Sequence, residues 1–174
     1  MDFGHRRTRE NVNLYMPAFP KLNLPPSTLK LIETDGITKV FDPCRRIYVK
    51  LTPEEYVRQS FLNYLTSSLD YPLGLTAIEY PIMINGQRQR ADIVVFNRRM
   101  KPHLIVECKA PQIPINQAVF NQALRYNTQL GVRYLIVTNG LTHFCAEIDG
   151  INSAHLLTQI PKYINDNSSP DGDK

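Results

Sequence analysis

No apolar run in the 174-residue sequence reaches the roughly 18 residues that a transmembrane helix needs. The longest apolar stretches, such as 104–106 and 134–137, are far shorter. The first ten residues are polar and arginine-rich, and no apolar segment follows them, so the features of a secretory signal are also missing. We therefore expect a cytoplasmic protein without a membrane segment.

Cysteine and metal-binding motifs are equally scarce. Cys44, Cys108 and Cys145 are odd in number and widely spaced, which does not fit a disulfide framework or a zinc cluster, so we expect reduced thiols. The four histidines have no partner at metal-ligand spacing. The sequence also lacks a glycine-rich phosphate loop, so we expect no nucleotide cofactor and no motor activity.

Composition is that of a globular protein, with 43% hydrophobic and 21% charged residues. The net charge of +4 permits a polyanionic partner without requiring one. Proline and arginine mark residues 1–39 as an extended segment, and the polar end at 165–174 is expected to be disordered. The folded domain should therefore occupy residues 40–164.

A helix is predicted to begin at Thr52, where a capping hydroxyl precedes Pro53 and is followed three residues later by Glu55. Apolar residues then recur at helical spacing, at Val57, Phe61, Leu62, Leu65 and Leu69. The stop signal is Asp70-Tyr71-Pro72. One apolar stripe predicts that this helix lies on a sheet.

Three strand-like runs follow, at 77–84, 90–97 and 103–109, and short turns join them, the first through Asn85-Gly86. They should be antiparallel neighbours. A second helix is expected at 116–130, ending at Gly131, before strands at 133–138 and 142–148. A connection through a helix favours a parallel fourth strand. The prediction is an α/β fold with helices flanking a mixed sheet of about five strands.

Charged residues mark two of these strands. Asp92 begins the second, and Glu107, Cys108 and Lys109 end the third. Alternation places Glu107 and Lys109 on one face of their strand, and a suitable register would bring Asp92 near Glu107. Two converging carboxylates attract a hard cation, and Mg²⁺ accepts one or two carboxylates with a backbone carbonyl, for which that of Cys108 is suited. With Lys109 to orient or deprotonate water, the group indicates metal-assisted phosphodiester hydrolysis.

This ordered set, a helix, then Asp92, then Glu107-x-Lys109 on the next strand, resembles the PD-(D/E)XK nuclease superfamily. The segments ADIVVFNRRMKPHLIVECKAP, NQALRYN and YLIVTNG are similar to the N-terminal nuclease domain of type I restriction enzyme R subunits, in a short free-standing form. The resemblance covers about residues 40–148. It implies a restriction-endonuclease-like core and a Mg²⁺-dependent DNA endonuclease of restriction-modification, with Mn²⁺ able to substitute.

The resemblance also assigns roles to single residues. Asp92, Glu107 and Lys109 match the catalytic core, and Gln122 with Tyr126 match a Gln-x-x-x-Tyr element on the following helix. The family places an acidic residue early on its first helix, for which Glu54 and Glu55 compete. At 100° per residue, Glu54 lies near the middle of the apolar stripe, whereas Glu55 lies at its edge and fits the capping role, so Glu54 is favoured.

Basic residues near these motifs are candidates for binding DNA phosphates, with Arg88 and Arg90 on one hairpin, Arg98 and Arg99 on the next turn, and Arg125 on the second helix. Tyr126 on that helix is a further candidate for contact with DNA. A second copy of the chain, or a separate motor or specificity protein, would complete the expected partners. Two other hypotheses remain open: a catalytically silent nucleic-acid-binding module of the same fold, and a protein interaction domain whose positive charge is incidental.

Overall fold

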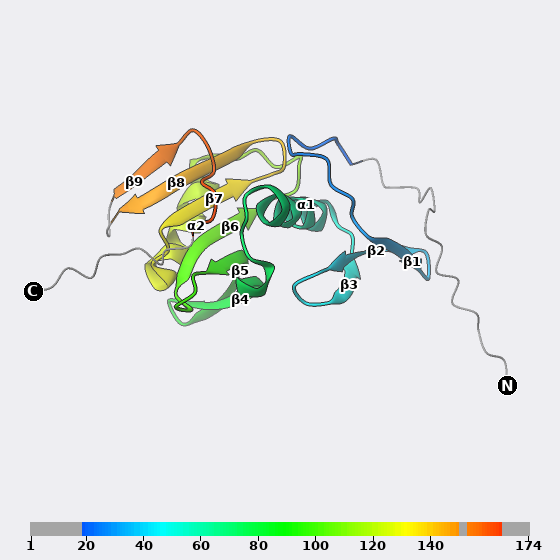
Figure 1. Ribbon diagram of the computed structural model, residues 1–174, viewed down its shortest axis with the longest axis horizontal. Coiled ribbons are helices and arrows are strands. Elements are labelled where there is room, and N and C mark those ends of the chain that lie inside the picture. The colour runs from blue at the N-terminus through cyan, green and yellow to red at the C-terminus, as the bar shows by residue number, and fades with distance from the viewer. Residues whose placement is uncertain (1–18, 150–152, 165–174) are drawn as a thin grey trace, which may run out of the picture.

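Two sheets and two α-helices make up residues 19–149 and 153–164, the part of the chain that the computed structural model describes (Figure 1). The polar tail predicted at 165–174 lies outside these residues, as do residues 1–18 of the predicted N-terminal segment. A small antiparallel sheet comes first, with strands β1 (Leu31–Thr34), β2 (Ile37–Asp42) and β3 (Ile47–Lys50). Within the described residues, no helix is long and apolar enough to cross a membrane.

The larger unit follows the predicted order. Its elements are α1 (Pro53–Ser68), the short 3-10 helix η1 (Leu73–Leu75), β4 (Thr76–Ile84), β5 (Gln87–Phe96), β6 (Pro102–Cys108), α2 (Gln117–Leu130), β7 (Tyr134–Thr138), β8 (His143–Asp149) and β9 (Ser153–Leu157). The six strands lie side by side in sequence order. β6 and β7 are parallel, as the intervening helix predicted, and the other neighbours are antiparallel. The mixed α/β fold is therefore confirmed.

Local signals explain where the elements begin and end. The Thr52 hydroxyl caps α1 by accepting a hydrogen bond from the backbone N–H of Glu55 at 3.1 Å. Gly131, with a φ of 59°, ends α2 in the left-handed conformation. Asn85 and Gly86 also have positive φ, 50° and 76°, as a tight hairpin turn between β4 and β5 requires.

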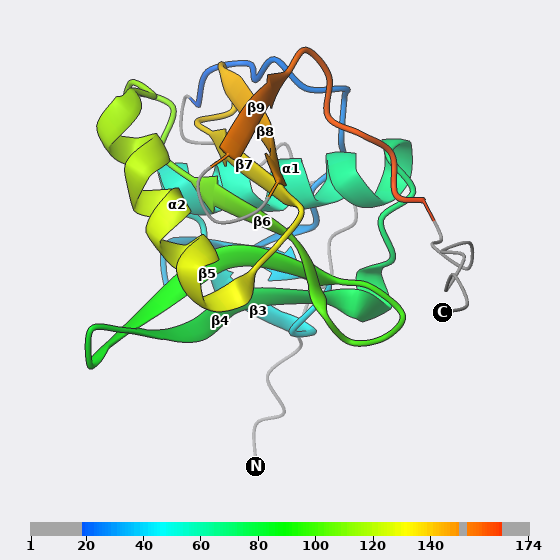
Figure 2. The ribbon, with the colours of Figure 1, turned by 90° about the vertical axis from the view of Figure 1, so that its left-hand side faces the viewer.

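The two helices cover opposite faces of the large sheet, and the β4–β5 hairpin projects beyond the other strands (Figure 2). Alternate residues of β6 feed two cores: Val106 and Cys108 pack with α1, whereas Ile105 packs with α2. This sandwich buries β6, β7 and residues 91–95 of β5 on both faces. Cys108 and Cys145 are buried free thiols and Cys44 is a half-buried one, which confirms the expectation for all three cysteines.

Two parts of the fold were not predicted. β9 adds a sixth strand at the edge of the sheet, where Leu156 is 68% exposed. The small sheet lies in a region that was expected to be extended, and β2 crosses the predicted boundary at residue 40. Its hairpin signal is present in the sequence, because Asp35-Gly36 forms the β1–β2 turn with φ of 53° and 71°.

Candidate active site

The site begins where β5 and β6 separate. The ladder between these strands runs from the Phe96–Pro102 pair to the Ile93–Val106 pair. Asp92, the next residue of β5, places its carboxylate in the opening, where its Oδ2 accepts a hydrogen bond from the backbone N–H of Cys108 at 2.7 Å. A side chain thus takes the place that a backbone carbonyl holds elsewhere in the ladder, which fixes Asp92 beside the end of β6.

Glu107 and Lys109 lie at that same end of β6. The Lys109 ammonium donates a hydrogen bond to Glu107 Oε1 at 2.7 Å. Glu107 is only 4% exposed, and its second oxygen, Oε2, is buried without a hydrogen-bond partner among the described residues. A buried acceptor without a partner is costly in free energy, so this oxygen is set up to receive a ligand.

The pKa values of Glu107 and Lys109 are shifted as expected for charged groups that lie close together. Burial raises the pKa of Glu107 to about 7, and the negative charge of Asp92 raises it as well, against the opposing effect of Lys109. Burial lowers the pKa of Lys109, but its hydrogen bond to Glu107 and the negative charges of Glu107, Asp92 and Glu54 together raise it more, so the net shift is upward. Lys109 is therefore a stable cation, and Glu107 is a carboxyl group that ionises reluctantly.

The first turn of α1 adds a third acidic group. Glu54 Oε1 lies 3.3 Å from the Arg58 guanidinium, and its negative charge acts on both Glu107 and Lys109. Burial and the charge of Asp92 raise the pKa of Glu54. Of the two candidate helix carboxylates, Glu54 is thus the one whose charge reaches the end of β6.

The exposure of the two glutamates does not follow their positions on the helical wheel. Glu55 is the buried one, at 6% exposure, while the Glu54 side chain is 44% exposed. Glu55 does not close a capping box either, because the Thr52 N–H donates to the Lys50 carbonyl. The reason is that the small sheet, through Arg45, covers the side of the helix that Glu55 occupies.

Arg58 is a central residue that the sequence analysis missed. Its guanidinium donates to Asp92 Oδ1 at 2.7 Å, forms a short ion pair with Glu55, and lies near Glu54. Burial lowers its pKa, but the charges of Asp92 and Glu55 raise it more. An arginine next to Val57, within an otherwise apolar stripe, was the available signal.

A second arginine ties the small sheet to this cluster. Asp42 of β2, which is fully buried, accepts hydrogen bonds from the backbone and the guanidinium of Arg45. Arg45 also pairs with Glu79 of β4 and lies 3.9 Å from Glu55 of α1. Glu79 adopts a positive φ of 51°, an unusual conformation for this residue, opposite the point where Asp92 leaves the β4–β5 ladder. The charged network therefore continues from the small sheet to Asp92.

The Gln-x-x-x-Tyr element of α2, formed by Gln122 and Tyr126, lies near Glu107. The Gln122 amide donates to the Tyr126 hydroxyl at 3.1 Å, and Gln122 is half-buried. Tyr126 is 4% exposed, and burial and the charge of Glu107 raise its pKa. Tyr126 is thus placed to orient Gln122 near the carboxylates.

The candidate phosphate-binding arginines fall into two groups. Arg88 and Arg90 are exposed on the β4–β5 hairpin, on the side of Asp92 that faces away from the β5–β6 turn, and Arg125 is exposed on α2. Arg98 and Arg99 lie in the β5–β6 turn, at the opposite end of that pair of strands from Glu107. The structure does not bring these two residues together with the carboxylates.

The donor set allows a test of whether a metal ion would fit. Both oxygens of Asp92 accept hydrogen bonds, one from Arg58 and one from Cys108. In residues 19–149 and 153–164 no three histidine, cysteine, aspartate or glutamate side chains converge as a ready metal site. The unpartnered Oε2 of Glu107 nevertheless offers one buried acceptor, and Mg²⁺ requires few protein carboxylates because it retains several waters.

Comparisons with known proteins identify similar sequences and structures. The model of one protein family, described as type I restriction enzyme R protein N terminus (HSDR_N), matches residues 53–161. The chain is also similar to the solved fragment of a protein assigned as an HsdR subunit of a type I restriction enzyme from Vibrio vulnificus YJ016, with 23% identity and a TM-score of 0.46. That similarity covers 64% of this chain and 24% of the other, so this chain spans about a quarter of its length. No curated protein sequence matches the chain.

Proposed function

The chain belongs to the family of type I restriction enzyme R protein N termini, and on that premise we propose that it is a Mg²⁺-dependent nuclease that cleaves DNA in a restriction-related role. One observation carries the proposal. Glu107 is buried with a free oxygen, beside the ammonium of Lys109 and within the field of Asp92. Buried charged groups that shift one another's pKa are concentrated at active sites, and phosphodiester hydrolysis uses such groups.

Asp92 and Glu107, with the backbone carbonyl of Cys108, would hold the ion. A divalent cation supplies charge neutralisation for the phosphate and makes a water more acidic. Mn²⁺ would satisfy the same oxygen donors. Because the ligands must be ionised, the upward shift in the pKa of Glu107 predicts that ion affinity rises with pH through about 7.

Lys109 is assigned to the phosphate and to orienting water. Its raised pKa keeps it protonated near neutral pH, so it is a donor and a positive charge and not a proton acceptor. Its hydrogen bond to Glu107 holds the ammonium at the end of β6. Of the two roles that the sequence left open for this lysine, orientation and deprotonation, the structure favours orientation.

The remaining residues position these groups. Arg58 holds Asp92, and Glu54 adds negative charge beside Arg58 and Lys109. Gln122, held by Tyr126, would contact water or the DNA. Arg88, Arg90 and Arg125 would contact phosphates near the carboxylates. A motor and a specificity protein would have to be supplied from outside this sequence, which has no phosphate loop for ATP.

Cleavage assays test the proposal directly. Supercoiled, linear and single-stranded DNA are incubated with Mg²⁺ or Mn²⁺ and wild-type protein, Glu107→Gln or Lys109→Met. Each substitution should lower the cleavage rate at least about 10³-fold while the far-UV circular dichroism spectrum stays unchanged. The matched control is Lys101→Met, which removes a lysine at the other end of β5 and β6 and should keep wild-type activity. Equal cleavage by wild type and Glu107→Gln would end the nuclease proposal.

A catalytically silent nucleic-acid-binding module is the second candidate, and one observation favours it. Arg58 already neutralises Asp92, so the carboxylates have a structural counterion. Calorimetric titration with Mn²⁺ separates the two candidates. The nuclease should bind the ion and lose that binding in Glu107→Gln, whereas the silent module should show no ion binding and no ion-dependent cleavage.

A further inference from the structure

One face of the small sheet carries a group of lysines and aromatic rings. Lys39 of β2 is directly opposite Lys50 of β3, and Phe41 is directly opposite Tyr48, so the four side chains share one face. The Phe41 and Tyr48 rings lie 5.2 Å apart between centroids. Lys30, which precedes β1, places its ammonium 5.8 Å from the centre of the Phe41 ring. We call these five residues the lysine-aromatic face.

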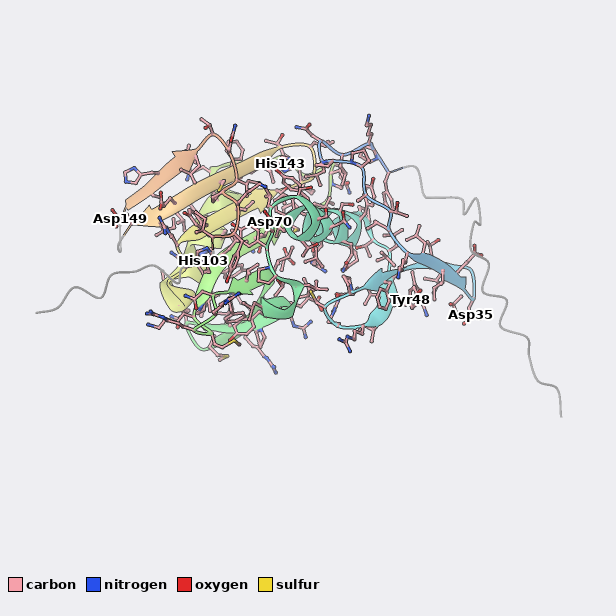
Figure 3. The ribbon with its side chains drawn as sticks, viewed as in Figure 1. Asp35, Tyr48, Asp70, His103, His143 and Asp149 are labelled. Carbon is pink, nitrogen blue, oxygen red and sulfur yellow. The ribbon has the colours of Figure 1, made fainter. Side chains whose placement is uncertain are left out.

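The lysine-aromatic face is the outer one. The opposite face of the small sheet carries Val40 and Asp42, which are fully buried. Tyr48 is 41% exposed, Lys30 and Lys50 are exposed, and the side chain of Tyr48 lies at the end of the molecule remote from Asp149 of β8 (Figure 3). Ring and ammonium groups are therefore accessible together.

Folding alone does not account for this arrangement. Like charges directly opposite each other on neighbouring strands are destabilising, and Lys39 and Lys50 are such a pair. Within residues 19–149 and 153–164, no carboxylate lies within ion-pair distance of Lys30, Lys39 or Lys50. A negatively charged ligand would remove this repulsion.

A hollow beside Phe41 adds polar groups to the face. Its volume is about 250 Å³, and it lies between Phe41 and α1, where the polar Gln59, Asn63 and Thr66 line it together with the apolar Leu29, Leu62 and Leu73. The Gln59 amide nitrogen already donates to Glu55 Oε1 at 2.8 Å, so the half-buried Asn63 amide is the group that can both donate and accept hydrogen bonds there. The hollow therefore offers hydrogen-bonding groups next to an aromatic ring.

We propose that the lysine-aromatic face binds single-stranded nucleic acid, with bases stacked on Tyr48 and Phe41 and phosphates held by Lys39 and Lys50. A single strand is the ligand whose chemistry fits, because it combines regularly spaced negative charges with exposed flat rings. A duplex hides the faces of its bases, and an acidic peptide lacks stacking rings. The hollow beside Phe41 would receive the edge of one base.

A strand bound to the lysine-aromatic face would be the substrate of the proposed nuclease, and this part of the inference rests on the proposed function. The small sheet lies outside residues 53–161, which the family model matches, so the face is a feature that this family match does not describe. Arg45 links the sheet to both α1 and β4, which fixes the face relative to Asp92 and Glu107. A strand bound there would thus have a defined position relative to the carboxylates.

Fluorescence anisotropy with a labelled single-stranded 20-nucleotide DNA tests the proposal, using the full chain in EDTA so that no cleavage occurs. Lys39→Gln/Lys50→Gln should weaken binding at least about tenfold and reduce the slope of log affinity against log salt by about 1.4. Tyr48→Ala should weaken binding about fivefold or more, whereas Tyr48→Phe, which retains the ring, should bind within about twofold of wild type.

The matched control is Lys21→Gln/Lys162→Gln, which also removes two exposed lysines and should bind like wild type apart from a small general charge effect. Thermal melting checks that every variant is folded. Binding by Lys39→Gln/Lys50→Gln equal to that of this control would overturn the proposal, and so would a failure of wild type to bind the strand at low salt. Tighter binding of duplex DNA with no effect of Tyr48→Ala would overturn it too.

The Glu107→Gln variant separates the two proposals. It should bind the strand like wild type, because Glu107 is not part of the lysine-aromatic face. If no protein preparation cleaves DNA but Lys39→Gln/Lys50→Gln still loses binding, the proposal for the lysine-aromatic face is supported and the nuclease proposal fails. If cleavage occurs but that double variant binds and cleaves normally, the nuclease stands and the face is wrong.

Discussion

The two ends of the β5–β6 pair carry similar numbers of charged residues but treat them differently. At the separated end, Asp92 and Glu107 are buried, and Arg58 and Lys109 are bound to them. At the turn end, Arg98, Arg99 and Lys101 are exposed around Asn97, whose side-chain oxygen accepts hydrogen bonds from two backbone N–H groups. At the separated end the charged groups have lost contact with water, which is unfavourable, whereas the turn end is an ordinary solvated turn.

Burial, and not charge alone, distinguishes the candidate site from the turn end. The exposed cations of the turn end would attract phosphates from solution, whereas at the separated end Asp92 and Glu107 offset the charges of Arg58 and Lys109. Only the separated end has an unpartnered carboxylate oxygen and a carboxyl group with a strongly shifted pKa. Substitutions at the two ends should therefore differ in size, and the contrast can be measured.

The largest effect is expected for Arg58→Met. The substitution leaves Asp92 and Glu55 buried without their shared cation, which should lower the free energy of unfolding by about 3–5 kcal/mol. Urea denaturation measures it, with Arg99→Met at the turn end as the control. Addition of Asp92→Asn to Arg58→Met should recover part of the loss. If Arg58→Met and Arg99→Met are equally stable, the two ends do not differ as described.

A smaller effect of opposite sign is expected for Glu107→Gln. The folded-state pKa of about 7 lies above the ordinary value of 4.5, so the stability that this group contributes is complete below pH 4.5 and is lost as pH rises through 7. A glutamine cannot ionise. In EDTA the variant should therefore exceed wild type by about 1–3 kcal/mol at pH 8 and differ little from it at pH 5.

Thermal or urea unfolding at several pH values checks this. Glu33→Gln on the exposed surface of β1 controls for the general loss of one negative charge. A Glu107→Gln variant that is less stable than wild type at pH 8 would show that Glu107 is well accommodated as an anion. The separated end would then lack the stored repulsion inferred for it.

At the turn end, Asn97→Ala should have a moderate effect. It removes the acceptor for the N–H groups of Arg99 and Lys101, each bound at 3.0 Å, and should cost about 1 kcal/mol. Because these groups can turn to water, a larger cost is not expected. Chemical denaturation measures the change, and the cleavage rate should stay at the wild-type value. A large loss of activity would connect the turn to the site.

The smallest effects are expected for Arg98→Ala and Arg99→Ala. Both side chains are exposed, so unfolding free energies should stay within about 0.5 kcal/mol of wild type. The cleavage rate should fall less than in Arg88→Ala and Arg90→Ala, because Arg88 and Arg90 lie closer to Asp92 along β5. Initial cleavage rates over a range of salt concentrations compare the four variants. Equal losses in all four would place DNA at both ends of the strands.

Much of the fold was predictable because its signals are local. The Thr52 cap, the Gly131 stop and the Asn85-Gly86 turn each act through neighbouring residues, and the structure contains all three. β9 was missed because it is an exposed edge strand with little apolar alternation to reveal it. The small sheet was missed although its Asp35-Gly36 turn was readable, because nearby prolines favoured an extended segment.

The candidate site was predictable only in part, for a related reason. Glu107 and Lys109 are neighbours in sequence, so alternation along one strand places them together. Arg58 and Asp92 are 34 residues apart, as are Arg45 and Glu79, and no local pattern predicts that they meet. The burial of Glu55 was not predictable because a helical wheel does not include the small sheet that covers one side of α1.

Arg45 also bears on how this domain can be divided. A fragment beginning at residue 53, where the family match starts, would lack the cation that pairs with Glu79 and lies near Glu55. Among the described residues, Glu79 would then lose its closest cation and keep only Arg90 at 3.9 Å, Glu55 would keep only Arg58, and the start of α1 would lose its cover. A fragment intended for transfer onto another protein should therefore include the small sheet.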